Sequence, residues 1–149
     1  MMGSLPRRAG FAIVLLATVA LTACDDIGGI DDGLDVQSAA LDVTPPGAAT
    51  RSYSVTAAGG ASPSPVRLRV GVNQLTATWL DGGRGETGAG QLTLIVTSLS
   101  DGITFRSLGG NRATLTVPTT ATAAFAELRA ERVDGSASFA ADLDLVVDR

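Results

Sequence analysis

Apolar and polar residues alternate with a period of two through much of this chain, and this pattern constrains its fold more than any other feature. Successive side chains of a β-strand point to opposite sides, so such alternation is typical of strands with one buried and one solvated face. The alternating apolar positions fall in four runs: Val66, Leu68, Val70 and Val72; Leu75, Ala77 and Trp79; Ala113, Leu115 and Val117; and Ala137, Phe139, Ala141, Leu143, Leu145 and Val147. The segment 91–99 is apolar on both faces instead, and we expect it to form a central strand.

Residues that favour turns separate these runs. They are Pro45-Pro46-Gly47, Gly59-Gly60, Pro63, Pro65, Asp81-Gly82-Gly83, Asp101-Gly102, Gly109-Gly110-Asn111 and Asp134-Gly135. Spacings of about 8 to 12 residues between turn signals are typical of antiparallel sandwiches and barrels. The sequence therefore predicts an all-β domain over residues 34–149: a single antiparallel β-sandwich of about seven to nine strands or, alternatively, a small closed β-barrel.

The segment 120–133 fits two patterns. Its residues Ala-Glu-Leu-Arg-Ala-Glu-Arg favour a helix, and Ala121, Ala124, Phe125 and Leu128 have helical spacing. The same segment also alternates as a strand, with Ala124, Ala126, Leu128 and Ala130 on one face. In that case Asp134-Gly135 would form a two-residue hairpin into the last strand. We favour the hairpin and keep the helix as the alternative.

A basic and apolar segment stands at the start of the chain. Two arginines, Arg7 and Arg8, precede an apolar run from Ala9 to Leu21, which is typical of a secretory signal. The run continues to Ala23 with two threonines and is followed at once by Asp25-Asp26, so it is short for a transmembrane helix, which needs about 20 apolar residues. The small residues that end it would also suit cleavage by an ordinary signal peptidase, and plain secretion is the alternative.

The end of this segment, Leu21-Thr22-Ala23-Cys24, resembles the lipobox of bacterial lipoprotein precursors. The resemblance implies removal of residues 1–23 by cleavage between Ala23 and Cys24, and acylation of Cys24, so that the chain contacts the membrane through a lipid anchor. It also implies a location in the bacterial cell envelope, with the domain in the periplasm or at the cell surface. Asp25 resembles an inner-membrane retention signal of enteric lipoproteins, but many bacteria do not follow that rule, and we slightly favour the outer membrane.

Residues 24–33 follow the predicted cleavage point and are rich in aspartate and glycine, so we expect a flexible acidic tether after the lipidated cysteine. The aspartates lack the closing glutamate of an EF-hand, and no metal site is predicted. The 126 residues left of 149 carry nine arginines and fifteen acids. This negative balance makes nucleic acid a poor partner.

The composition removes most routes to catalysis. The chain has no histidine and no lysine, and its one cysteine is the predicted lipid acceptor. Catalytic triads, serine–lysine pairs and the usual zinc sites therefore cannot be assembled. Paired carboxylates remain, with Asp81, Glu86 and Asp101 as candidates for a hydrolase, but their spacing selects no pair. We predict a protein that is not an enzyme and needs no cofactor.

Two polar features suggest contact with a partner. Gly83-Arg-Gly-Glu-Thr-Gly88 matches the glycine pattern of nucleotide-binding loops, but a strand follows it rather than a helix, so we expect a hairpin connection whose Arg84 and Glu86 could touch a partner. Asp142, Asp144 and Asp148 share one face of the last strand. They could form a row that binds a cation or a basic partner. We favour the other interpretation, a solvated face or a strand edge whose charges prevent pairing with another chain. Arg67 and Arg69 are expected to pair with acids across strands.

The aromatic residues after the signal segment are few, and we expect each in the core: Tyr53, Trp79, Phe105, Phe125 and Phe139. The inward faces are rich in valine, leucine and alanine, which suits a packed sandwich better than a barrel with a lumen. We therefore expect a membrane-anchored lipoprotein with a non-catalytic binding or structural module and a possible envelope protein partner. A small-ligand carrier is the alternative, although a small-molecule ligand is disfavoured, and a carboxylate-dependent hydrolase is the remote one.

Overall fold

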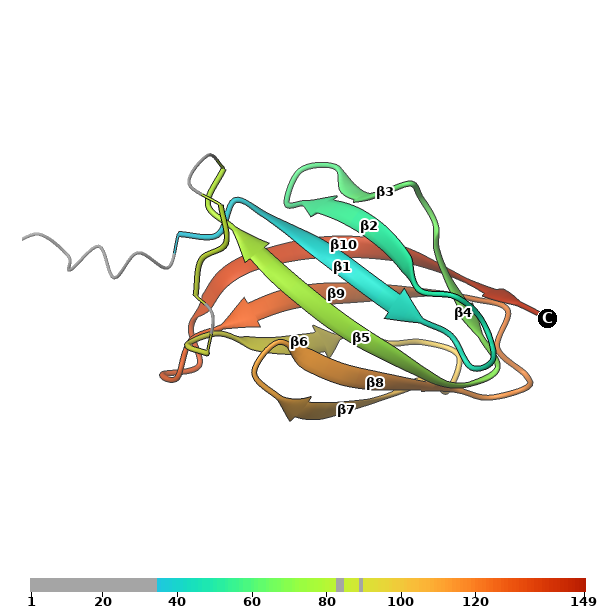
Figure 1. The fold of residues 1–149 in the computed structure, drawn as a ribbon. Helices are drawn as coiled ribbons and strands as arrows, with labels where there is room; N and C mark the ends of the chain where they lie inside the picture. The colour runs from blue at the N-terminus through green and yellow to red at the C-terminus, as the bar shows by residue number, and fades with distance from the viewer. Residues whose placement is uncertain (1–34, 83–84, 89) are drawn as a thin grey trace, which may run out of the picture. The chain divides into compact units, whose positions relative to one another are not determined.

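The computed structural model describes residues 35–82, 85–88 and 90–149, and this part of the chain is all-β (Figure 1). The predicted signal peptide, Cys24, the tether and Arg84 lie outside the described residues. The described residues form ten strands, against the seven to nine predicted. They are β1 (Ser38–Thr44), β2 (Arg51–Thr56), β3 (Gly60–Ser62), β4 (Val66–Arg69), β5 (Gly71–Leu80), β6 (Thr93–Thr97), β7 (Thr104–Gly109), β8 (Arg112–Val117), β9 (Ala123–Glu131) and β10 (Ala137–Asp148). Within this part, no helix has the length and apolar character that a bilayer crossing requires.

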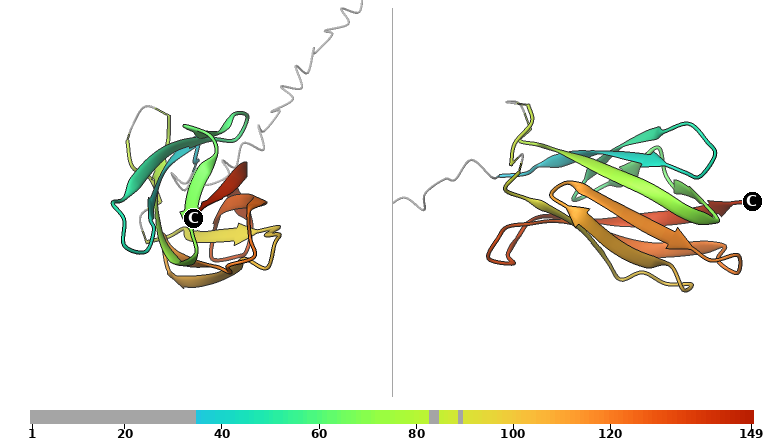
Figure 2. Two further views of the ribbon diagram at one scale, coloured as in Figure 1. Left: turned by 90° about the vertical axis from the view of Figure 1, so that its right-hand side faces the viewer. Right: turned by 60° about the horizontal axis from the view of Figure 1, so that its bottom comes forward.

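The strands form two separate curled sheets that face each other, which confirms the predicted sandwich rather than the closed barrel (Figure 2). The larger sheet has the order β3-β2-β1-β5-β8-β7, and the smaller sheet has the order β4-β10-β9-β6. The described strands pair antiparallel except β4 and β10, which are parallel, so the expectation of a wholly antiparallel sandwich was wrong at this pair. β4 follows β3 of the opposite sheet and is not joined to β10 by a hairpin, which would force an antiparallel pair. The crossing from the other sheet therefore lets β4 run parallel to β10.

The core lies between the two sheets and is built from alternate residues of each strand. Leu75, Ala77 and Trp79 of β5 are buried, and the Trp79 ring lies 6.2 Å from the ring of Phe139, centroid to centroid, across the sandwich. The predicted buried faces of β8 and β10 are confirmed, apart from the exposed Ala137 at the start of β10. The alternation therefore identified most of the core directly.

The ambiguous segment 120–133 forms a strand, β9, as the alternation predicted. Its even-numbered residues from 124 to 130 are buried against the larger sheet. The predicted two-residue hairpin was wrong, because the Arg132 amide donates to the Ser136 carbonyl and leaves a three-residue loop. Gly135 adopts a φ of +82° in this loop, the left-handed position of a three-residue hairpin. Two hydrogen bonds from Ser136, first from its hydroxyl and then from its amide, lower the pKa of Asp134.

The run from Val66 to Val72, predicted as one strand face, divides between the two sheets. Val66 and Leu68 are buried in β4, but Val72 is 52% exposed and β5 buries the opposite parity, beginning with Asn73. The change occurs at Gly71, whose φ of +104° is strained for any residue with a Cβ. The chain crosses here from the smaller sheet to the larger one, so the alternation restarts with its phase shifted by one residue.

The segment 91–99 contributes β6, which was predicted as a central strand but lies at an edge of the smaller sheet. Leu94 and Val96 face the core, while Ile95 on the other face is only half-buried. The β7–β8 turn approaches this edge, and the Leu94 amide donates to the Gly110 carbonyl over 2.7 Å. The β7–β8 turn thus covers part of this edge, which explains why β6 has apolar residues on both faces although only one strand pairs with it.

At the opposite edge of the smaller sheet, the backbones of β3 and β10 come close together. β4 pairs with Leu145–Asp148 of β10, and β3 approaches β10 further back, near Asp142. A Cβ added at Gly60 of β3 would lie 2.8 Å from the Asp142 carbonyl oxygen, and Gly60 has a φ of +62°. Glycine at this position therefore permits both the backbone conformation and the approach of the two sheets.

Candidate functional site

The outer face of the smaller sheet carries an exposed aromatic side chain. Phe125 is 71% exposed, so the expectation that it lies in the core was wrong. Tyr53, Trp79 and Phe139 are buried as predicted, and Phe105 is half-buried on β7. The position of Phe125 follows from the strand itself, because residue 125 has the parity of Glu127, Arg129 and Glu131, all outside the buried alanine and leucine row.

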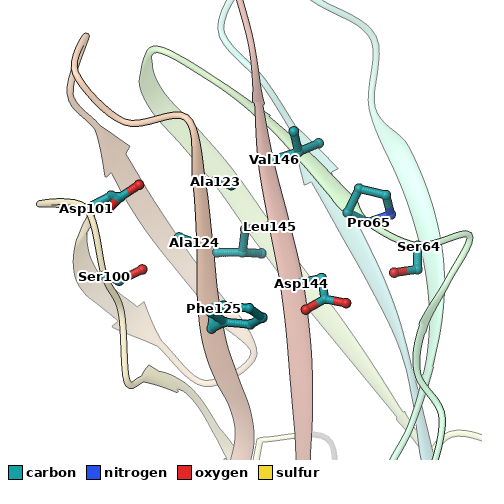
Figure 3. A pocket seen from close by; sticks show the side chains of 10 residues that line it. All are labelled: Ser64, Pro65, Ser100, Asp101, Ala123, Ala124, Phe125, Asp144, Leu145 and Val146. Carbon is teal, nitrogen blue, oxygen red and sulfur yellow. The ribbon is translucent and has the colours of Figure 1, made fainter.

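Phe125 separates two hollows on this face. The larger has a volume of about 580 Å³ and the smaller about 440 Å³, and both include Phe125 and Asp144 in their walls. Ser64 and Pro65 of the β3–β4 connection border the larger hollow on one side. Figure 3 shows Ser100 and Asp101 on the other side and the Phe125 ring extending from β9 toward Asp144 on β10. We call the two hollows together the Phe125 groove.

The groove is acidic. Asp144 lies directly opposite Phe125 in the β9–β10 register, and Asp142 lies opposite Glu127. Asp142 and Asp144 are exposed and make no ion pair within the residues that the structure describes. Asp101 is exposed at the border of the larger hollow. Three exposed carboxylates therefore line the groove that contains the Phe125 ring.

The other acids of this face have cationic neighbours. Asp148 accepts hydrogen bonds from Arg51 over 2.9 Å and from Arg67 over 2.8 Å, which confirms the expected cross-strand partner for Arg67. The hydrogen bond from Arg51, followed by that from Arg67, lowers the pKa of Asp148, and the same contact with Asp148 raises the pKa of Arg51. Arg129 lies between two glutamates, 3.7 Å from Glu127 and 3.4 Å from Glu131.

The aspartate row of β10 therefore divides into a paired end and an unpaired middle. Asp148 is neutralised by arginines, whereas Asp142 and Asp144 face solvent beside Phe125. β10 lies between β4 and β9, so these charges do not blunt an edge of the sheet, and that part of the favoured interpretation was wrong. The solvated face and the cation-binding row remain as interpretations of Asp142 and Asp144.

The three carboxylates considered for hydrolysis do not form one group in the structure. Asp81 follows β5 and Glu86 bridges back to Leu80, whereas Asp101 follows β6, which points toward the other end of the sandwich (Figure 1). Among the described residues, no group of three or more metal-ligating side chains occurs. The structure therefore places Asp81 and Glu86 in one hairpin and separates Asp101 from both.

The glycine-rich segment forms a hairpin extension in its described part. The Thr87 amide donates to the Trp79 carbonyl over 2.8 Å, and the Asp81 amide donates to the Gly85 carbonyl over 3.1 Å. Glu86 is exposed beside this ladder. Arg84 lies outside the described residues, so the contact of Arg84 and Glu86 with a partner protein stays a prediction.

Neither models of protein families nor curated proteins match this chain. The site must therefore be interpreted from its own chemistry. An exposed aromatic ring beside carboxylates suits a ligand with an apolar or planar cationic part, because the ring face attracts cations and the carboxylates accept their hydrogen bonds.

Proposed function

We propose that this chain is the precursor of a lipid-anchored bacterial envelope lipoprotein whose β-sandwich is a non-catalytic binding module. The observation that carries the proposal is Leu21-Thr22-Ala23-Cys24 at the end of a basic and apolar leader. A single acyl chain gives only marginal membrane binding, whereas two or three acyl groups on one residue give a lasting anchor. The acidic residues 25–33 then need no affinity for lipid and serve as a spacer.

The Phe125 groove supports a binding role for the domain. It is an exposed, concave surface on a sandwich whose interior is filled by large side chains, among them Trp79, Leu41 and Leu128. A carrier of small apolar ligands would need an enclosed space between its sheets. The packed interior and the open groove together favour a surface-binding module over the carrier.

Metabolic labelling tests the anchor. The full chain is expressed in a bacterial host fed an alkyne analogue of palmitate, and the purified protein is examined for label and by intact mass. The wild type is expected to carry label, to begin at Cys24 and to sediment with membranes. Cys24→Ser removes the acceptor thiol and is expected to lose the label, since no other cysteine is present.

Leu21→Asp is the matched control, because it keeps the thiol and disrupts the apolar lipobox. It is expected to be unlabelled and to retain residues 1–23. A wild-type protein that is cleaved before Cys24 but released without label would support plain secretion and refute the anchor. Label retained by Cys24→Ser would also refute it.

We further propose that the anchor lies in the outer membrane. Membrane fractionation of the wild type and of Asp25→Ser tests this location. Both forms are expected in the outer-membrane fraction. A wild type found in the inner membrane that moves outward in Asp25→Ser would show that the aspartate acts as a retention signal and would contradict the proposal.

A further inference from the structure

We propose that the Phe125 groove binds an extended basic segment of a partner protein, with an arginine side chain stacked on the Phe125 ring and paired to Asp144. This inference rests on the proposed function as a binding module and names the chemistry of its partner. It is carried by two independent features of the same surface, the exposed ring and the local excess of negative charge.

The exposed Phe125 ring offers an occupant of the groove a contact surface. Phe125 is the most exposed aromatic side chain among the described residues, and the linings of the hollows on its two sides include the small residues Ala123 and Ala126. A ring in this position offers an open face to a planar group. The arginine guanidinium is planar and weakly hydrated, so it stacks on aromatic faces more readily than an ammonium group does.

The charge around the ring favours a cationic occupant. Asp148, Glu127 and Glu131 are all within ion-pair distance of arginines of this chain. Asp142 and Asp144 have no such neighbour in the described part, although they lie on the same strand as Asp148. A partner with arginines would give Asp142 and Asp144 the cationic neighbours that the other acids of this face already have.

The spacing of the acids indicates an extended segment. Asp142 and Asp144 are two residues apart on one face of β10, which places their Cα atoms about 6.8 Å apart. An extended peptide also presents residues i and i+2 on one side at this interval. Arginines at i and i+2 would therefore meet Asp142 and Asp144 together, whereas adjacent arginines would point to opposite sides.

The same charges argue against a second copy of this chain as the occupant. A two-fold symmetric contact places the same patch on both sides of the interface. Asp142 and Asp144 would then face their own counterparts around Phe125, and like charges brought together disfavour association. The proposal is therefore a heterologous basic partner.

Fluorescence anisotropy of labelled peptides tests the proposal. The full-length chain with Cys24→Ser, purified in detergent, is titrated into a peptide of sequence Gly-Ser-Arg-Thr-Arg-Ser-Gly. The isomer Gly-Ser-Arg-Arg-Thr-Ser-Gly has the same composition and charge and serves as the spacing control. We expect the first peptide to bind several-fold more tightly than its isomer, with both weakened by salt.

Substitutions then locate the contact. Asp144→Asn removes one charge and is expected to raise Kd about tenfold, the effect of losing one charged hydrogen-bonded contact. Phe125→Ser keeps the charge and is expected to raise Kd about three- to fivefold through loss of the cation–π contact. Asp42→Asn makes the same charge change in β1, in the larger sheet, and is expected to leave Kd unchanged.

Equal effects of Asp144→Asn and Asp42→Asn would reduce the binding to bulk charge and overturn the proposal, as would equal affinity for the two peptides. Binding of an oligosaccharide in place of the peptide, or a dimer that dissociates in Phe125→Ser, would assign the groove to another occupant. The assay does not depend on lipidation. A labelled Cys24 with no peptide binding would thus refute this inference alone, and an unlabelled Cys24 would refute the proposed anchor alone.

Discussion

Replacement of Asn73 by alanine tests how the chain crosses from one sheet to the other. The Asn73 side chain is fully buried beside the Gly71 corner. Its Oδ1 accepts a hydrogen bond from the Arg69 amide over 2.9 Å, and its Nδ2 donates to the Arg69 carbonyl over 2.7 Å and to the Gly71 carbonyl over 3.2 Å. The Asn73 side chain thus supplies hydrogen-bond partners for backbone groups of Arg69 and Gly71, at the point where the chain crosses from one sheet to the other.

The expected cost follows from these three bonds. Each contributes about 1 kcal/mol to the free energy of unfolding, and the backbone groups left behind are only partly accessible to water, so Asn73→Ala should lose about 3 kcal/mol. With a urea m-value of about 1.5 kcal/mol per molar, the midpoint of urea unfolding should fall by about 2 M. Far-UV circular dichroism against urea measures this shift.

Two further variants make the test specific. Gln74→Ala changes the exposed neighbour of Asn73 in β5 and should stay within about 0.5 kcal/mol of the wild type. Asn73→Asp keeps an acceptor for the Arg69 amide but turns a carboxylate toward two carbonyls, so it should be strongly destabilised at neutral pH and recover in part on acidification, when the protonated carboxyl can donate. If Asn73→Ala and Gln74→Ala had the same midpoint, the role given to Asn73 would be refuted.

The remaining predictions concern the core and the surface ion pairs. Trp79→Ala should cost about 3–5 kcal/mol in urea unfolding, and Trp79→Phe should cost less, because the buried indole N–H has no hydrogen-bond partner among the described residues. Equal losses in the two variants would contradict this account of the ring. Asp148→Asn should lower stability by less than about 1 kcal/mol at neutral pH, since the Asp148 side chain and its arginines are partly exposed. The pKa of Asp148 is lowered in the folded state, so its contribution to stability is present above the ordinary aspartate pKa of 3.8 and is lost as the pH falls through the lowered value. The urea midpoints of wild type and Asp148→Asn should therefore converge in acid. A difference that stays constant with pH would argue against the ion pair.

The predicted and observed folds agree where the alternation within one strand is enough to tell which residues are buried. The alternation of Leu75, Ala77 and Trp79 placed these residues in the core, and the structure buries all three. The same rule applied to β9 would have placed Phe125 outside, but its helical spacing with Leu128 obscured that signal in the sequence. The Phe125 groove also needs β10 and the two bordering connections, which no local pattern brings together.

The sequence by itself determined that the described domain is all-β and which faces of most strands are buried, because side-chain direction in a strand is a local property of the backbone. It also supplied the lipobox resemblance at Cys24, which depends on adjacent residues alone. The tertiary structure decided the order of the strands, the edge position of β6 and the parallel pairing of β4 with β10. It also decided that Asp148 meets arginines while Asp142 and Asp144 stay free of ion pairs within the described residues. These outcomes depend on which strands become neighbours, and hydrogen bonding between strands does not depend on their distance along the chain.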